Sequence, residues 1–401
     1  MHTEMNTEVN NAMTMSKEER VLRVINHQDV DYLPSQITFS DRLRDKPLSE
    51  ALGLAGAHEL DAYLENHLYL SLSRHDKVLF YRNDRAEMDR LQTMGYCGPD
   101  WKNKIVYDAW GMGVQVGTDG FFACFHPLQN QAGPEVAGFM VPGFNRDVLC
   151  QEIEEAIANY KAPNTNQPGL YDDLAEDLKK HSGDFLVIPC GYFGIFERVW
   201  GLMGFPEFMI NMATNPKAAH DFLDKVTDYR VEYAKHVVEM GFKVGHHGDD
   251  LGTQNGTLIS KQMFREFVLP RFKRAWQPYN DAGIPIILHS CGNLMDFIPD
   301  LIDIGLRVLE PIQSCMDLNL LKREFGKDLT FWGGIETQKL PFLTPEGVKR
   351  MTRDTIRILG KGGGYIIGPS QEVMNDVPLA NVIALVETIV EERTRVLDVT
   401  D

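Results

Sequence analysis

The sequence predicts an α/β protein built as a (β/α)8 TIM barrel, and three observations support this fold class. From about residue 150 onward, short apolar segments alternate with amphipathic helical segments. Helical connections of ten or more residues join parallel strands. The number of these units in 401 residues suits a closed eight-stranded barrel. An open doubly wound sheet would carry a Gly-rich phosphate loop after its first strand, and the sequence shows none there.

The N-terminal part of the chain is less regular. Residues 1–15 are polar and lack periodicity, so we expect a disordered tail or an extension. A single barrel domain is expected over residues 16–398. It begins with an amphipathic helix in SKEERVLRVINHQ and a first strand in DYLPSQITFS. Between about 45 and 145, helical, aromatic and Gly-rich pieces predict an irregular elaboration of hairpins or loops.

The later units carry clear start and stop signals. The strand DFLVIPCG is followed by a helix with Asn215 as its N-cap and Pro216 at its first position. The strands FKVGHHGDD and PIILHSCG flank a helix that Ser260 caps. The strands RVLEPIQ, LTFWGG and GYIIGPS alternate with the helices LMDFIPDLIDIG, MDLNLLKREFG and TPEGVKRMTRDTIRILG. A C-terminal helix is predicted in ANVIALVETIVEERTRVL.

Composition restricts the classes of function. The chain has 40 Lys and Arg against 57 Asp and Glu, a net charge of -17, which disfavours nucleic acids and anionic membranes as partners. No apolar run approaches the roughly 18–20 residues of a membrane helix, and the N-terminus lacks the pattern of a signal peptide. We therefore expect a cytoplasmic protein that binds a neutral organic molecule or another protein. Six scattered cysteines predict reduced thiols rather than disulfides.

Polar residues gather at the predicted carboxyl ends of the strands, where barrel enzymes build their active sites. His289 and Cys291 lie two positions apart, so on a strand both side chains face the same way. Imidazole and thiolate are zinc ligands, although the spacing by itself favours a chance pair over a metal site. A third ligand would have to come from another strand end, and the candidates are Glu310, Glu372 and Cys315.

Other strand ends supply candidate substrate contacts. Strand alternation predicts that Asp250 points into the barrel, where it could act as acid, base or fourth metal ligand. Its neighbour Asp249 is a candidate substrate contact, with helix capping or turn stabilisation as the alternative. Tyr192 and Phe193 precede a predicted helix and Trp332 lies at a strand end. All three are candidates to stack on a hydrophobic or aromatic ligand.

Several segments, taken in order, resemble the uroporphyrinogen decarboxylase superfamily. They are SKEERVLRVINHQDVDYLP, FGIFERVWGLMGF, GDDLGTQNG, LHSCGN, LLKREFGKDLTFWGGIETQ and GGGYIIGPSQEVMNDVPLANV. The resemblance extends over nearly everything from residue 16 to 398 and implies a (β/α)8 barrel. True uroporphyrinogen decarboxylases carry an N-terminal motif ending in RQAGR, which LPSQITFSDRLRDKP lacks. Their substrate carries several carboxylates and therefore requires a basic cleft, whereas this chain is acidic.

The other large branch of the superfamily comprises methyltransferases that act with a separate corrinoid protein. Its coenzyme M enzymes hold zinc with a His-x-Cys at one strand end and a second Cys at the end of the last strand. His289 and Cys291 match the first pair, while Gln371 stands where the second Cys is expected. The resemblance thus implies zinc held by His289 and Cys291, and we predict Glu310, from its place at the next strand end, as the third ligand. Substrate would lie beside Gln371, and either Asp250 or Glu372 would position or protonate the leaving oxygen.

The absent second cysteine favours a reaction at oxygen. Replacing a thiolate with Gln or Glu leaves a harder, more Lewis-acidic zinc, which suits an ether or alcohol better than a thiol. We therefore predict methyl transfer from a methoxylated substrate, with an aromatic one favoured, to the Co(I) of a corrinoid protein. The cobalamin must come on that partner, because the chain lacks an Asp-x-His-x-x-Gly signature.

Three alternatives stay open at this point. The first is methyl transfer from a methylcobamide to a thiol in the same barrel. The second is a metal-free protein related to uroporphyrinogen decarboxylase, and the third is a non-catalytic binding or regulatory barrel. The sequence is also compatible with a homodimer.

Overall fold

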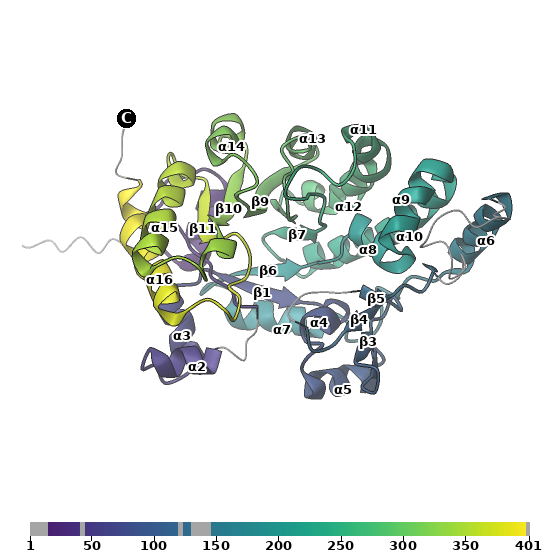
Figure 1. Ribbon diagram of the computed structural model, residues 1–401, viewed down its shortest axis with the longest axis horizontal. Helices are drawn as coiled ribbons and strands as arrows, with labels where there is room; N and C mark the ends of the chain where they lie inside the picture. The colour runs from purple at the N-terminus through teal and green to yellow at the C-terminus, as the bar shows by residue number, and fades with distance from the viewer. Residues whose placement is uncertain (1–14, 41–44, 119–122, 130–145, 398–401) are drawn as a thin grey trace, which may run out of the picture.

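A parallel α/β core forms the C-terminal part of the computed structural model, which describes residues 15–40, 45–118, 123–129 and 146–397 (Figure 1). The predicted tail falls outside these ranges except for its last residue. Five parallel strands form one sheet in the order β11-β10-β9-β8-β7. Their bounds are Gly245–Gly248 for β7, Ile286–His289 for β8, Leu306–Ile312 for β9, Thr330–Ile335 for β10 and Tyr365–Pro369 for β11.

Helices connect these strands as the periodicity predicts. They are α11 (Lys261–Met263), which continues through a π-helical turn (Phe264–Val268) into α12 (Leu269–Asp281), then α13 (Ile298–Asp303), α14 (Leu318–Phe325), a 3-10 turn (Thr337–Lys339) and α15 (Pro345–Gly360), with α16 (Leu379–Arg395) last. The Ser260 side chain accepts a hydrogen bond from the Met263 amide at 3.2 Å, so the predicted cap is confirmed.

Within the described residues 146–239, five helices precede this sheet along the chain. They are α6 (Arg146–Asn159), α7 (Asp172–His181), α8 (Phe196–Met203), α9 (Phe205–Thr214) and α10 (Pro216–Glu239). Asn215 caps α10 by accepting from the Ala218 amide, and Pro216 is its first residue, as predicted. α10 packs along α12, whose Phe272 and Trp276 rings contact His247 of β7. None of the helices within the described ranges is both long and apolar enough to cross a membrane.

The assigned strands do not close into one eight-stranded sheet. β1 (Leu68–Leu72) and β6 (Leu186–Cys190) form a separate two-stranded parallel sheet. A hydrogen bond of 2.7 Å from Gly248 N–H to the Gly191 carbonyl joins the ends of β7 and β6. On the other side, Ser35 makes isolated parallel bridges to Asn66 and to Ile367 of β11. The α/β class is confirmed, whereas the predicted first strand is reduced to isolated bridges beside Pro34, which has no amide hydrogen to donate.

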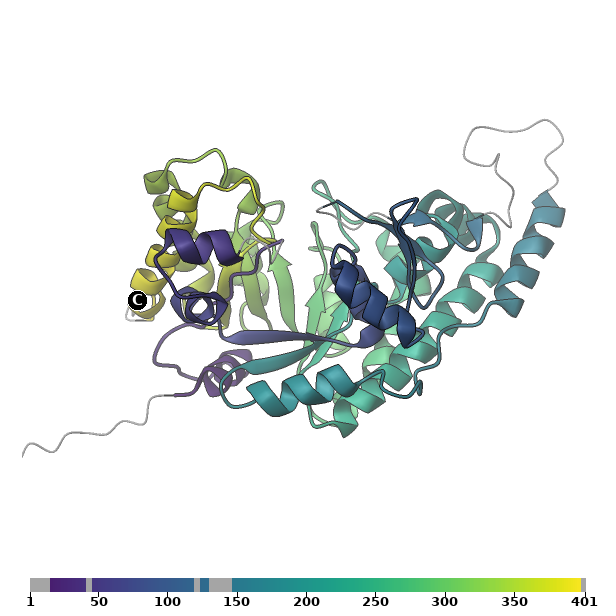
Figure 2. The ribbon, with the colours of Figure 1, turned by 90° about the horizontal axis from the view of Figure 1, so that it is seen from below.

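The N-terminal elaboration contains short helices and an antiparallel sheet, in agreement with the predicted hairpins (Figure 2). The helices are α2 (Asp45–Ala51), α3 (Ala57–Leu64), α4 (Arg74–Phe80) and α5 (Arg85–Thr93). The predicted first helix is α1 (Lys17–Ile25), which contacts β6 and β11. The sheet runs in the order β2 (Gly98–Asp100), β3 (Ile105–Tyr107), β4 (Gly113–Gln115) and β5 (Ala123–Phe125).

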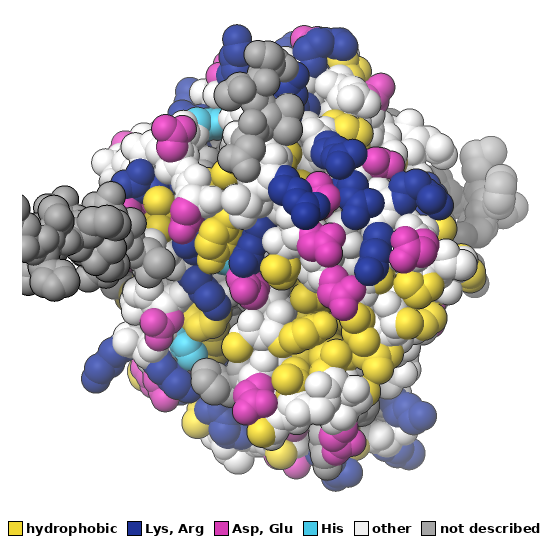
Figure 3. Space-filling view, turned by 90° about the vertical axis from the view of Figure 1, so that its left-hand side faces the viewer, with side chains coloured by type: hydrophobic (Ala, Val, Ile, Leu, Met, Phe, Trp, Pro, Cys, Tyr) yellow, Lys and Arg dark blue, Asp and Glu magenta, His cyan; other side chains and the backbone are white. Residues whose placement is uncertain are grey.

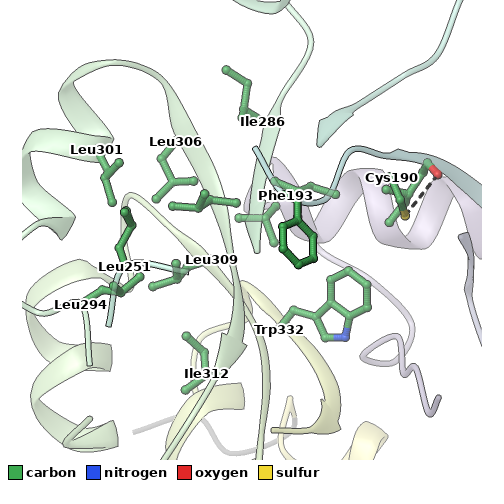
Figure 4. Packing of buried hydrophobic residues seen from close by; sticks show 14 of the residues in the cluster. Cys190, Phe193, Leu251, Ile286, Leu294, Leu301, Leu306, Leu309, Ile312 and Trp332 are labelled. Carbon is green, nitrogen blue, oxygen red and sulfur yellow. Dashed lines mark hydrogen bonds between the residues drawn. The ribbon is translucent and has the colours of Figure 1, made fainter. Parts of the chain in front are cut away.

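The hydrophobic core lies on the two faces of the parallel sheet, between the strands and the segments that cover them (Figure 4). Ile286, Leu306, Leu309 and Ile312 are completely buried, as expected for strands covered on both faces. At the end formed by α15 and α16, basic and acidic side chains interleave (Figure 3), and Lys349 pairs with Glu387 across the two helices at 3.1 Å.

Candidate metal centre

Three potential metal ligands meet at the carboxyl ends of β7 and β8. His289 is the last residue of β8, Cys291 follows it by two positions, and Asp250 follows the end of β7. Their ligand atoms all lie within 4.8 Å of one another. His289 Nε2 is 3.9 Å from Cys291 Sγ and 3.8 Å from Asp250 Oδ1. All three residues are partly buried, so the group is protected from bulk water yet accessible.

Backbone contacts between two loops hold this group in place. The Cys291 amide donates to Asp250 Oδ1 at 2.8 Å, and the Gly252 amide donates to the Cys291 carbonyl at 3.2 Å. Gly292 has φ of +90°, and a Cβ on it would lie 2.2 Å from the carbonyl carbon of Gly252. Glycine is therefore required here because the two loops touch through their backbones.

Glu310 lies behind the imidazole rather than among the three ligand atoms. Its Oε2 is 2.6 Å from His289 Nδ1, the ring nitrogen opposite Nε2. Parallel pairing of β8 with β9 sets His289 directly across from Glu310, so this contact follows from strand register. A carboxylate on the second ring nitrogen fixes the ring orientation and the tautomer of a metal-binding histidine. Among the described residues it is Asp250, rather than the predicted Glu310, whose carboxylate lies with His289 and Cys291 in the group of potential ligand atoms.

The electrostatics of the group favour protonated His289 and a protonated thiol. Burial lowers the pKa of His289, but the charge of Glu310 and the hydrogen bonds to Cys291 and Glu310 outweigh it and hold the pKa well above its usual value. Burial raises the pKa of Cys291, and its hydrogen bond to His289 opposes this. A metal ion that binds here must displace both protons.

Gln371 joins the metal group to a neighbouring cavity. Its Nε2 donates to Cys291 Sγ at 3.2 Å, which places an amide against the thiol. The cavity has a volume of about 420 Å3 and is lined from the ends of β9, β10 and β11. Glu372 lines it beside Gln371. Other lining residues include Gln254, Gln313, Glu336, Thr337, Phe342, Ser370, Met374 and Asp376.

The predicted aromatic contacts are placed differently from one another. The Tyr192 ring packs edge-on against His289 with 5.2 Å between ring centroids, so it lies beside the metal group. Phe193 is only 8% exposed and Trp332 only 7%, and both belong to the core (Figure 4). The indole of Trp332 packs over Gly368, where an added Cβ would come within 3.3 Å of Nε1.

Asp249 caps α8 instead of facing the site. Its carboxylate accepts hydrogen bonds from the amides of Ile195 at 2.6 Å, Phe196 at 2.9 Å and Glu197 at 2.6 Å. The side chain is fully buried. Helix capping was the alternative to a substrate contact for Asp249, and the burial of the cap leaves none of its surface for a substrate.

Two buried ionisable residues near the group were missed from the sequence. Burial raises the pKa of Glu197 well above its usual value, and the charges of Asp250 and Asp249 add to this effect. Burial lowers the pKa of His246 well below its usual value, and its Nδ1 accepts a hydrogen bond from the Gly191 amide. The alternation that selected Asp250 would also have selected His246. Glu197 lies in a helix and carries no such signal.

Comparisons with known proteins identify a family for this chain. The model of the family Uroporphyrinogen decarboxylase (URO-D) matches residues 178–392, just over half of the chain. A "Methylated-thiol--coenzyme M methyltransferase" of Methanosarcina mazei is 28% identical over 232 residues, which cover 56% of this chain and 57% of that protein. A uroporphyrinogen decarboxylase of Crocosphaera subtropica is 24% identical over 177 residues, 44% of this chain and 48% of its own length.

The chain therefore spans about half the length of the curated relatives it matches. Among solved structures, a methyltransferase from Methanosarcina mazei has a similar fold, with a TM-score of 0.56 at 18% identity. That match covers 94% of this chain and 99% of the other.

Proposed function

This chain belongs to the uroporphyrinogen decarboxylase (URO-D) family, and we propose that it is a zinc-dependent methyltransferase. In this proposal it moves a methyl group from a methoxylated small molecule to the Co(I) of a separate corrinoid protein. The observation that carries the proposal is the group of Asp250, His289 and Cys291, with the amide of Gln371 on the only thiol of that group.

The donor atoms of this group fit zinc. A carboxylate, an imidazole and a thiolate belong to the ligand types that zinc binds in catalytic sites. Asp250, His289 and Cys291 would hold the ion, while Glu310 would fix the ring of His289 through its other nitrogen. Zinc in this position would supply a Lewis acid for the oxygen that leaves the methyl group.

The proposed reaction is a methyl transfer in which one bond breaks at the methyl carbon and one bond forms there. The bond between the methyl carbon and the ether oxygen breaks, and its electron pair stays on the oxygen, which takes up a proton. The electron pair of Co(I) forms the new bond to carbon, so the products are an alcohol or phenol and methyl-Co(III). We assign to Glu372 the task of positioning the leaving oxygen or its proton, because Glu372 lines the cavity next to Gln371.

The surroundings of Cys291 support oxygen over sulfur chemistry. Among the described residues, the ligand group contains one thiol, and the Gln371 amide donates a hydrogen bond to it at 3.2 Å. Such a bond draws negative charge from sulfur, so less of it reaches a bound ion. A single, hydrogen-bonded thiolate with a carboxylate makes a harder Lewis acid than two thiolates.

A second candidate reaction is methyl transfer from a methylcobamide to a thiol. It is favoured by the 28% identical relative from Methanosarcina mazei, whose name describes a methylated-thiol--coenzyme M methyltransferase. In the first reaction the corrinoid accepts the methyl group as Co(I), and in the second it donates the methyl group as methyl-cobalt. The two reactions can therefore be separated by supplying one or the other form of the corrinoid.

The deciding experiment supplies the purified protein with zinc, a reduced corrinoid protein and a panel of methoxyphenols and methoxybenzoates. Formation of methyl-cobalt, followed by its absorbance, is the expected result. If no ether, alcohol, amine or thioether methylates the cobalt, the proposal is wrong. Thiol-dependent loss of methyl from a methylated corrinoid protein would instead support the second candidate.

Metal content tests the ligand assignment separately. We expect Cys291→Ala to lose most of the zinc that the wild type binds, because it removes one of three ligands. Cys315→Ala is the matched control, since Cys315 is also half-buried but lies outside the ligand group. Equal zinc in wild type and Cys291→Ala, measured by elemental analysis, would refute Cys291 as a ligand.

A further inference from the structure

An exposed apolar rim borders the cavity beside the metal group. Phe342, which follows β10, is 86% exposed, the highest fraction among the large hydrophobic side chains of the described ranges. Met374, which follows β11, is 37% exposed. Both residues line the cavity that Gln371 and Glu372 line, and we call this pair the apolar rim. The other exposed large hydrophobic residues, Met94, Ile210 and Val390, do not line the cavity.

The high exposure of Phe342 indicates a contact with another macromolecule rather than with a small ligand in the cavity. A side chain that gripped a small molecule inside the cavity would be largely buried by the cavity walls, as the neighbouring Ser370 is at 4% exposed. A phenylalanine this exposed contributes almost nothing to the free energy of folding. Apolar side chains that stand in water at the mouth of a site are typical of surfaces that another macromolecule covers.

The size of the cavity excludes a corrinoid from its interior. Pockets that enclose a drug-sized ligand have volumes of about 300–1,000 Å3. The cavity of about 420 Å3 lies at the lower end of this range, and a corrinoid is several times larger than such a ligand. The cobalt of the corrinoid must therefore reach the methyl group from outside the cavity. The protein that carries the corrinoid must then contact the mouth of the cavity.

Charge at the mouth indicates the character of the partner surface. The carboxylates of Glu336, Glu372 and Asp376 line the same cavity as the apolar rim. Lys339 pairs with Glu336 at 2.7 Å, and none of the residues that line the cavity is basic. An apolar centre with an acidic margin fits a partner that has an apolar patch surrounded by basic side chains.

We propose that the apolar rim of Phe342 and Met374 is the docking surface for the corrinoid-carrying domain of the partner protein. This inference rests on the proposed function, since it concerns where the methyl acceptor binds. Phe342 is the anchor, because it is the more exposed of the two and can enter a pocket of the partner.

The test compares two methyl acceptors, the corrinoid protein and free cob(I)alamin. Phe342→Asp should lower kcat/KM toward the corrinoid protein by about tenfold or more through a higher KM. Its kcat/KM toward free cob(I)alamin should stay within about twofold of wild type, because the free cofactor needs no docking surface. Phe342→Leu should retain most of the activity with both acceptors. Ile210→Asp, a charge placed at an exposed residue of α9, should match wild type.

Several results would overturn the inference. Equal losses with both acceptors would assign Phe342 to the small substrate, and wild-type rates with both would remove the rim from the interface. Sedimentation of the chain with the corrinoid protein gives a second readout that does not depend on turnover. If Phe342→Asp binds the partner as wild type does, the inference fails. It also fails if the substitution instead causes a homodimer of this chain to dissociate. If wild type methylates neither acceptor, the proposed function fails, and sedimentation still decides docking.

Discussion

At the scale of single residues, two side chains set the chemistry of the candidate metal centre without belonging to the ligand group. Glu310 orients His289 through Nδ1, and Gln371 donates a hydrogen bond to the Cys291 thiol. The first contact fixes which ring nitrogen would face a bound ion, and the second would limit the charge that sulfur could give to it. Gln371 is therefore the residue that we expect to separate chemistry at oxygen from chemistry at sulfur.

Gln371→Cys should convert the centre into one with two thiolates. We expect tighter zinc binding and, after replacement of zinc by Co2+, a stronger sulfur-to-cobalt charge-transfer absorption, because a second soft ligand joins the ion. Activity with methoxylated donors should fall while activity with thiols rises. Gln338→Cys is the control, because it adds a thiol to the same cavity from the 3-10 turn after β10 rather than at the residue whose side chain contacts Cys291. Its Co2+ spectrum should match that of wild type. The same spectrum in Gln371→Cys would contradict the assignment.

At the scale of elements, the loop after β7 serves two elements with two adjacent carboxylates. Asp249 points back and caps α8 with three hydrogen bonds, whereas Asp250 points toward His289 and Cys291. The two roles are separated because the side chains of these neighbouring residues leave the backbone on opposite sides, as they would if the alternation of β7 continued past Gly248. Helix capping and the proposed metal binding are thus divided between consecutive residues.

Asp249→Ala should destabilise the protein by about 2–4 kcal/mol, because it removes a buried cap and leaves three amide donors of α8 without their acceptor. The midpoint of urea unfolding measures this loss. Asp250→Ala is the matched control and should lose zinc with a much smaller change in the midpoint, since its side chain is partly exposed. Similar midpoints for the two variants would contradict this division of roles.

At the scale of the whole molecule, buried His67 ties the N-terminal helix to the core. Its Nε2 lies 3.3 Å from Arg20 Nη1 of α1, and its Nδ1 lies 2.7 Å from the Glu65 carbonyl. These contacts suit a neutral ring that donates from Nδ1 and accepts at Nε2. Burial, with the charge of Arg20 beside it, lowers the pKa of His67 to about 4.

This pKa predicts a loss of stability in acid. In the unfolded chain His67 takes up its proton near pH 6.5, whereas in the folded protein it does so only near pH 4. The stabilisation is therefore present above pH 6.5 and is lost as the pH falls toward 4, by about 2–3 kcal/mol between pH 7 and 4.5. His67→Gln should be less stable at pH 7 but should lose less on acidification. Urea unfolding at the two pH values measures both, and parallel losses in wild type and variant would exclude His67 as the cause.

The sequence by itself determined the features that depend on neighbours along the chain. Helical and strand periodicity placed the parallel units, and side-chain oxygens three residues ahead of their amide partners placed the caps at Asn215 and Ser260. The spacing of His289 and Cys291 predicted that their side chains face the same way, and Cys291 Sγ lies 3.9 Å from His289 Nε2. Each of these signals is local, since it arises from backbone geometry over a few residues.

Only the tertiary structure decided which distant residues join that pair. The pairing of β8 with β9 sets Glu310 behind His289, and the loop after β7 brings Asp250 41 residues away in sequence to the Cys291 amide. The burial of Asp249 and the contact from Gln371 to Cys291 likewise arise between separate units. A shift of one residue in strand register would exchange every inward and outward side chain, and this register is set by packing of the whole core rather than by any local pattern.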